Sequence, residues 1–247
     1  MGSPYKRVVI KISGNALFNF DGSAKELETD DLLTNLLTQI KVVQQQGVQV
    51  AVIFGGGNIC RGKQMAACGV KRTTADNIGM LATVINSLII RERLSKMGAP
   101  CVLMSSFTVG NMTVPFEPFL AIRDLEAGNI VICAGGTGNP FVTTDTAASL
   151  RSIQVEADAL IKLTKVHGVY DKDPNKFADA KLFKSLSYDY VLEKQLKIMD
   201  LGAFNQCKLY NMPIHVANYH EADVVTRIVN GGTIGTIISN EVMDDVE

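Results

Sequence analysis

The sequence lacks several features that would point to other classes of protein. It has no tryptophan, and 24 Lys and Arg residues nearly balance 25 Asp and Glu residues, for a formal net charge of −1. Without a basic excess, no charge field favours binding to nucleic acid or to an anionic membrane surface. No apolar run approaches the roughly 18 residues that a membrane-spanning helix needs. We therefore expect a cytoplasmic protein with no nucleic-acid partner and no membrane partner.

Cysteine and histidine, which often bind metals or act as nucleophiles, occur here without a recognisable pattern. The five cysteines are odd in number, and no pair has the spacing of a zinc site or a C-x-x-C redox motif. Cys101 and Cys133 fall in apolar runs, where cysteine behaves as a small buried hydrophobe. A reduced compartment is the simplest interpretation. Structural or surface roles are predicted for the three histidines, His167, His215 and His220.

The order of apolar segments predicts an α/β fold. Continuously apolar runs predict strands at residues 8–12, 48–54, 102–104, 130–134, 159–164, 214–217 and 236–238. Apolar residues at helical spacing predict helices at 29–46, with Thr29 as the cap, and at 75–97, 119–127, 145–153, 188–194, 201–211 and 222–229. This alternation is typical of a mostly parallel open sheet with helices on both faces. With no repeat and no proline-rich linker, residues 1–247 are expected to form a single domain.

Three glycine-rich loops follow predicted strands, at residues 11–15, 55–63 and 135–138. In open α/β sheets, ligands bind outside the carboxyl ends of the strands, where such loops converge. Glycine permits close backbone approach, so that successive N–H groups can face one anion, and a following helix adds its positive end. These loops predict a phosphate-rich ligand that is contacted from several sides.

The first two loops each contain a basic residue with two possible roles. Lys11 ends a strand, and its ammonium group either neutralises phosphoryl oxygens or merely extends to solvent. Residues 57–63 fit G-x-x-x-x-G-K, but Gln64 stands where a P-loop has Ser or Thr, so we reject that motif. No loop completes G-x-G-x-x-G either. Arg61 is suited to bidentate phosphate contact, or is a surface residue on a tight turn.

The third loop and its neighbours supply acids and hydroxyls. Residues 137–145 pack amides, hydroxyls and glycine before a helix, a composition that suits a base and a phosphate. Asp145 would cap that helix, order an active-site lysine or contact a metal. Asp76, near a helix start, would cap it or accept hydrogen bonds from ligand hydroxyls. Residues 164–174 end in Asp-x-Asp-Pro, which is also typical of a surface turn.

Taken together, these segments resemble the bacterial-type uridylate (UMP) kinases of the amino-acid kinase superfamily. The resemblance extends from Lys6 to about Ile238, and its best segments are residues 11–14, 55–62, 76–83, 135–150, 164–174 and 199–204. Gly-Thr-Gly-Asn-Pro-Phe followed by Thr-Thr-Asp is its most specific part. The resemblance implies a three-layer α/β/α sandwich around a mostly parallel open sheet.

The resemblance also implies an activity and its residues. It implies transfer of the γ-phosphoryl group of Mg²⁺-bound ATP to UMP, giving UDP and ADP for pyrimidine nucleotide biosynthesis, in line and without a covalent intermediate. The implied catalytic residues are Lys11, Arg61, Asp145 and Asp200. The implied ATP contacts are Lys11, Ser13, Gly14, Gly57, Arg61, Thr164, Tyr170 and Asp173. The implied UMP contacts are Gly56, Asp76, Thr137, Gly138, Asn139, Pro140, Phe141, Val142, Thr143 and Thr144.

In this family the UMP site lies mainly in the N-terminal part of the chain and the ATP site mainly in the C-terminal part. No residue is singled out as a Mg²⁺ ligand. Relatives form homohexamers and commonly respond to GTP as activator and UTP as inhibitor. Two departures stand out, because Asn15 replaces the usual acid after Ser-Gly and His167 replaces the usual Asp in Val-Asp-Gly-Val-Tyr.

Two competing functions remain on the same fold. A superfamily kinase that phosphorylates a carboxylate or carbamate is disfavoured by Asp76 and residues 137–144, which match the nucleotide-acceptor pattern. A nucleotide-binding storage or regulatory protein is disfavoured because four residues are retained together, namely Lys11, Arg61, Asp76 and Asp145. An assay of nucleoside phosphorylation distinguishes all three.

Overall fold

The computed structural model describes residues 3–17, 25–60, 65, 68–174, 176–196, 198–241 and 245–246. Its strands are β1 (Arg7–Ile12), β2 (Gln49–Phe54), β3 (Cys101–Ser105), β4 (Val114–Pro115), β5 (Ile130–Ala134), β6 (Ala159–Thr164), β7 (Phe183–Ser187), β8 (Ile214–Asn218), β9 (Thr236–Ser239) and β10 (Asp245–Val246). Its helices are η1 (Gly14–Ala16), a short 3₁₀ turn, and α1 (Lys25–Gln45), α3 (Arg72–Lys96), α4 (Pro118–Glu126), α5 (Thr144–Gln154), α6 (Tyr188–Glu193), α7 (Leu201–Leu209) and α8 (Val224–Val229).

The described strands form one sheet in the order β10-β7-β9-β8-β6-β1-β2-β5-β3-β4. From β8 to β4 in this order every neighbouring pair is parallel, and every residue of β1 and β5 is buried. A strand buried on both faces needs apolar residues throughout, which is the pattern that predicted it. The predicted mostly parallel α/β sheet is confirmed.

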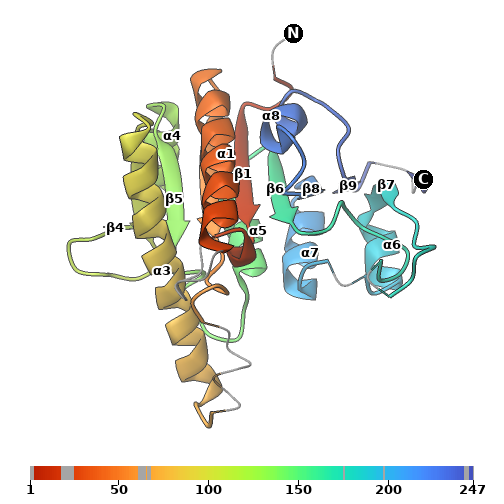
Figure 1. The fold of residues 1–247 in the computed structure, drawn as a ribbon, viewed down its shortest axis with the longest axis horizontal. Helices are drawn as coiled ribbons and strands as arrows, with labels where there is room; N and C mark the ends of the chain where they lie inside the picture. The colour runs from red at the N-terminus through yellow and green to blue at the C-terminus, as the bar shows by residue number, and fades with distance from the viewer. Residues whose placement is uncertain are drawn as a thin grey trace.

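Helices cover both faces of the sheet, with a separate apolar core on each side. One core joins β1, β2 and β5 to α1, α3 and α8, and the other joins the opposite faces of these strands to α4, α5, α6 and α7. In Figure 1, α1, α3 and α8 lie in front of the sheet, while α5 and α7 lie behind it. The predicted three-layer arrangement is therefore confirmed. Among the helices of the described residues, none combines the length and apolar character needed to cross a bilayer.

The antiparallel pairs of the sheet, and one strand that was not predicted, lie toward the edge built from the C-terminal part of the chain. The predicted last strand, β9, runs antiparallel to β8, and β10 is antiparallel to β7. β7 was not predicted, because two polar residues, Lys184 and Ser185, separate its buried Phe183 and Leu186 and leave no continuous apolar run.

Two helices begin earlier than the sequence suggests. Thr29 was predicted to cap a helix, but α1 begins at Lys25 and includes Thr29, so this prediction is wrong. The preceding Lys-Glu-Leu-Glu run consists of strong helix formers, which extend the helix toward the N-terminus. Likewise α3 begins at Arg72 with Lys71 as its N-cap, so Asp76 lies a full turn inside and does not cap it.

The loops after β1 and β2 pack against each other backbone to backbone. A methyl group added at Gly14 would lie 2.8 Å from the carbonyl oxygen of Gly55 and 2.8 Å from the amide nitrogen of Gly57. A methyl group at Gly55 would likewise lie 2.8 Å from the amide nitrogen of Gly14. No side chain fits at these distances, which explains why the sequence has glycine at positions 14 and 55. The contact brings the end of β1, with Lys11, beside the triple-glycine loop.

His215 at the start of β8 is buried, and its Nε2 lies 2.7 Å from the Tyr5 hydroxyl. Burial lowers the pKa of His215 from 6.5 to about 4. The unfolded chain therefore takes up a proton at this residue before the native state does, so stability falls as the pH is lowered from 6.5 toward 4.

We expect the free energy of unfolding to fall less between pH 7 and pH 5 in His215→Gln than in the unmodified chain, by about 2 kcal/mol. Denaturant titrations at both pH values measure this difference. The control His220→Gln changes an exposed histidine, leaves His215 in place, and should keep the original pH dependence. An unchanged slope in His215→Gln would contradict the prediction.

Candidate active site

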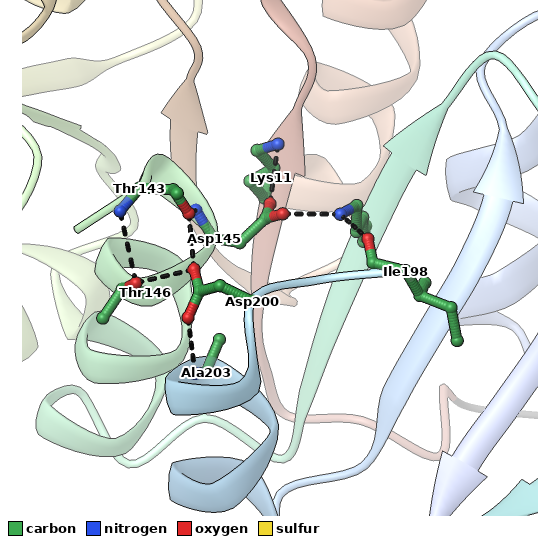
Figure 2. Close-up of polar contacts among 8 residues, drawn as sticks. Lys11, Thr143, Asp145, Thr146, Ile198, Asp200 and Ala203 are labelled. Atoms are coloured by element: carbon green, nitrogen blue, oxygen red, sulfur yellow. Dashed lines mark hydrogen bonds and ion pairs between the residues drawn. The ribbon is translucent and has the colours of Figure 1, made fainter. Parts of the chain in front are cut away.

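Two buried lysines share one carboxylate at the carboxyl ends of the central strands. Lys11 on β1 lies directly opposite Lys162 on β6 in the parallel register. The Nζ of Lys11 is 2.7 Å from Oδ1 of Asp145, and the Nζ of Lys162 is 2.6 Å from Oδ2 of the same carboxylate. Lys162 also donates to the carbonyl oxygen of Ile198, as Figure 2 shows. Each lysine is only 7% exposed.

The charges of this cluster do not cancel, because two ammonium groups face one carboxylate. Burial opposes ionisation of Asp145, but the two lysines outweigh it and hold the pKa of Asp145 below its usual value. Burial lowers the pKa of Lys162, and the positive charge of Lys11 acts in the same direction while Asp145 opposes it. These three residues therefore carry an excess positive charge in a poorly solvated position, where it attracts anions, and the nearby Asp200 carboxylate, which also raises the pKa of Lys162, offsets part of it.

The first turn of α5 fixes the position of Asp145. Thr143 is the N-cap of α5, and its hydroxyl accepts a hydrogen bond from the Asp145 amide at 3.0 Å. Asp145 is therefore inside the helix, so of its three suggested roles capping is wrong. Its side chain is free to lie between the lysines, which is the contact that the structure shows.

Asp200 holds two helices together beside this cluster. As the N-cap of α7, it accepts a hydrogen bond from the Ala203 amide at 2.9 Å. Its other carboxylate oxygen accepts from the hydroxyls of Thr143 at 2.6 Å and Thr146 at 2.7 Å (Figure 2). Asp200 thus anchors the start of α5 and, through it, the position of Asp145.

A cavity of about 260 Å³ opens between α3 and the loops after β2 and β5, and we call it the α3 cavity. Among the residues implied as UMP contacts, its lining includes Gly56, Asp76, Thr137, Asn139, Val142, Thr143 and Thr144, and Gly57 lines it as well. Gly138, Pro140 and Phe141 belong to the same loop but are not part of this lining.

Asp76 ties α3 to the loop that closes the α3 cavity. Its carboxylate accepts a hydrogen bond from the Phe141 amide at 2.8 Å and pairs with Arg72, also at 2.8 Å. Phe141 has φ of +69°, a conformation that bulky residues rarely adopt. The hydrogen bond to Asp76 therefore stabilises a strained residue at the rim of the cavity.

A second cavity, of about 570 Å³, lies beyond the end of β6, and we call it the β6 cavity. Three residues implied as ATP contacts, Thr164, Tyr170 and Asp173, line it together with Lys162. Because Thr143 and Thr144 line the α3 cavity, the two cavities flank the cluster of Lys11, Asp145 and Lys162. Ser13 and Gly14 lie in the loop that follows Lys11, outside the linings of both cavities.

Some predicted features lie elsewhere or cannot be placed. Arg61 lies outside the described residues, as does the side chain of Asn15. His167, the second departure, has its Nδ1 2.6 Å from Oε1 of Glu221 and so joins the loops after β6 and β8.

Sequence reasoning missed Lys162. The signal was present, because Lys162 interrupts the apolar run Ala-Leu-Ile-Lys-Leu-Thr of a strand that is otherwise buried. A charge in such a position requires a partner or a function.

Comparison with known proteins identifies this arrangement. The sequence model described as the amino acid kinase family matches residues 6–218, so the fold and site define a member of that family. Uridylate kinases from Methylococcus capsulatus and Xanthomonas campestris are 43% and 45% identical over 234 and 235 residues, 95% of this chain and 97% and 96% of theirs. The crystal structure of UMP kinase from Bacillus anthracis superposes with a TM-score of 0.92 and 36% identity, covering 99% of both chains. Within the amino acid kinases, the chain belongs to the uridylate kinases.

The shared carboxylate of Lys11, Asp145 and Lys162 leads to a testable prediction about stability. Asp145→Asn leaves two buried ammonium groups without an anion, and we expect the free energy of unfolding to fall by roughly 3–5 kcal/mol. Lys11→Met should cost clearly less, because Lys162 still neutralises Asp145 and the methionine fills the space. Denaturant unfolding measures both. Equal losses in the two variants would contradict the shared-carboxylate account.

Proposed function

We propose that this chain transfers the γ-phosphoryl group of Mg²⁺-bound ATP to UMP, forming UDP and ADP. The observation that carries the proposal is the pair of cavities flanking a buried cluster with excess positive charge. Identities of 43% and 45% with proteins named uridylate kinase support the choice of acceptor.

We place UMP in the α3 cavity and ATP in the β6 cavity. The α3 cavity is the smaller, and its glycines, hydroxyls and the Asp76 carboxylate suit a monophosphate with a ribose and a pyrimidine. The β6 cavity is larger, and Tyr170, Val166 and Leu196 supply an aromatic ring and apolar surface for a purine. The acceptor site would thus be built mainly from the N-terminal part of the chain and the donor site mainly from the C-terminal part.

The chain acts on the reaction chiefly through charge and position. An oxygen of the UMP phosphate attacks the γ-phosphorus, and the bond from that phosphorus to the ADP oxygen breaks on the opposite side, without a covalent enzyme intermediate. Negative charge on the transferred group is stabilised by Lys11 and Lys162, which Asp145 holds together. Ser13, Gly14, Gly57 and Arg61 remain proposed contacts to the ATP phosphates.

The described residues offer no ready-made protein site for Mg²⁺. Nowhere among them do three His, Cys, Asp or Glu residues converge. The carboxylates of Asp145 and Asp200 are already engaged by lysines, hydroxyls and an amide. Mg²⁺ therefore enters as part of the donor substrate, bound to the ATP phosphates.

We extend the proposal to assembly and regulation in the cytoplasm. Leu81 and Ile85 on α3 are 46% and 44% exposed, and such apolar residues on one helix support a contact between subunits. A homohexamer that responds to GTP and UTP is the arrangement implied by the resemblance to bacterial-type uridylate kinases.

A coupled assay of ADP release tests the function. With Mg²⁺ and ATP, we expect turnover with UMP well above that with CMP, dTMP or no acceptor. Lys11→Met should lower kcat at least about 10²-fold, because its charge stabilises the transition state. Lys41→Met, on α1 and outside both cavity linings, is the matched control and should keep the activity. ATP binding without phosphorylation of any acceptor would instead favour a storage or regulatory protein.

A second prediction separates the two nucleotide sites. Asp76→Asn weakens the contacts that hold the Phe141 amide and the rim of the α3 cavity. We expect KM for UMP to rise about tenfold and KM for ATP to change less than about twofold. Asp189→Asn, which removes an exposed carboxylate on α6, controls for the loss of charge. Equal increases in both Michaelis constants would refute an acceptor-site role for Asp76.

A further inference from the structure

Arg151 on α5 is a buried cation without a carboxylate partner. It is 5% exposed, and no ion pair to it occurs among the described residues. Arg7, which is equally buried, pairs with Glu126 at 3.4 Å. A guanidinium buried without an anion is unfavourable unless neutral groups accept its hydrogen bonds.

The contacts of Arg151 are directed at the glycine loop after β5. The Nη2 of Arg151 donates to the Ser106 hydroxyl at 2.7 Å and to the Gly136 carbonyl oxygen at 3.4 Å. The Ser106 hydroxyl itself donates to the same carbonyl oxygen at 2.6 Å. Arg151 also donates to Gln154, and its guanidinium lies 3.9 Å from the centre of the Phe116 ring. Its Nε is buried without a partner.

These bonds fix the orientation of the peptide unit between Gly136 and Thr137. The described residues contain no cis peptide bond, so the carbonyl of Gly136 and the N–H of Thr137 point in opposite directions. The carbonyl faces Ser106 and Arg151, and the N–H therefore faces away from them. No hydrogen-bond partner for this N–H occurs in the described part of the chain, and both Gly136 and Thr137 line the α3 cavity.

A third element holds the same loop from the opposite side. The Thr83 hydroxyl of α3 accepts a hydrogen bond from the Gly135 amide at 2.9 Å. Gly135 has φ of +77°, and a methyl group there would lie 2.8 Å from the Ser105 hydroxyl oxygen. The loop is thus held between α3 and the end of β3, and the Gly136 carbonyl is the point at which a cation contacts it.

We infer that Arg151 is a positioning residue for the acceptor nucleotide, which it serves by fixing and polarising the Gly136–Thr137 peptide so that the Thr137 N–H donates to UMP. A charge-assisted hydrogen bond to a carbonyl strengthens the hydrogen bond that the same peptide donates from its other end. The inference rests on the proposed function, since it assigns UMP to the α3 cavity. It predicts a selective effect on UMP, because none of these contacts reaches the β6 cavity.

Steady-state kinetics and calorimetric UMP binding on the full chain test the inference. We expect Arg151→Gln to raise KM and Kd for UMP about tenfold, with KM for ATP changed less than about twofold. Arg151→Lys, which keeps a positive donor, should restore most of the loss. Arg123→Gln, which removes an exposed arginine from α4, is the matched control and should leave both constants unchanged.

Ser106→Ala provides a second variant should Arg151→Gln fail to fold. It removes the shorter hydrogen bond to the Gly136 carbonyl, so it should raise KM for UMP about threefold, again selectively. In the double variant the two effects should fall short of multiplying, because both act on one carbonyl.

The possible failures are distinct. If the unmodified chain does not phosphorylate UMP, the proposed function fails and the inference with it. If the unmodified chain phosphorylates UMP, two results would overturn the inference alone. One is an equal rise in both Michaelis constants in Arg151→Gln, and the other is an unchanged KM for UMP in Ser106→Ala.

Discussion

Two ammonium groups and one carboxylate are buried together where β1, β6 and α5 meet, and the rest of the site depends on how they are held. The parallel register of β1 with β6 sets Lys11 opposite Lys162. The first turn of α5 places Asp145 between them, and Asp200 with Thr143 fixes where that turn begins. A change in any of these supports separates charges that cannot be left unpaired in a buried position.

The charge of the same cluster accounts for the anionic ligands proposed for both cavities. An ion pair with equal charges would leave little field outside it, whereas two cations on one anion leave a net positive charge at the junction of the cavities. The N-terminus of α5 lies at the same junction and adds a partial positive charge. In the proposed reaction, a phosphoryl group between two nucleotides would supply the negative charge that the cluster lacks.

Much of the fold could be predicted because buried parallel strands need continuous apolar runs, and those runs are visible in the sequence. The direction of β9 could not be predicted, because an apolar segment has the same composition whether it runs parallel or antiparallel to its neighbour. The starts of the helices were harder to predict, since α1 begins at Lys25, in a run of good helix formers that precedes the cap predicted at Thr29.

The candidate site was only partly visible for a similar reason. The glycine loops were recognisable because they follow predicted strands, and Lys11 because it stands at the end of one. The pairing of Lys162 with Lys11 depends on which strands are neighbours, and this information is absent from any local pattern. Arg151 was also hidden, because a lone arginine on a helix resembles a solvated surface residue until its burial is known.

The close approach of Gly14 and Gly55 has a mechanical consequence. With no side chain between them, the loops after β1 and β2 cannot move toward each other, because their backbones are already in contact. One loop carries on from Lys11, and the other forms a wall of the α3 cavity. A displacement of either loop toward its neighbour must carry that neighbour with it, so a shift of this wall of the α3 cavity toward β1 is transmitted to the loop that follows Lys11.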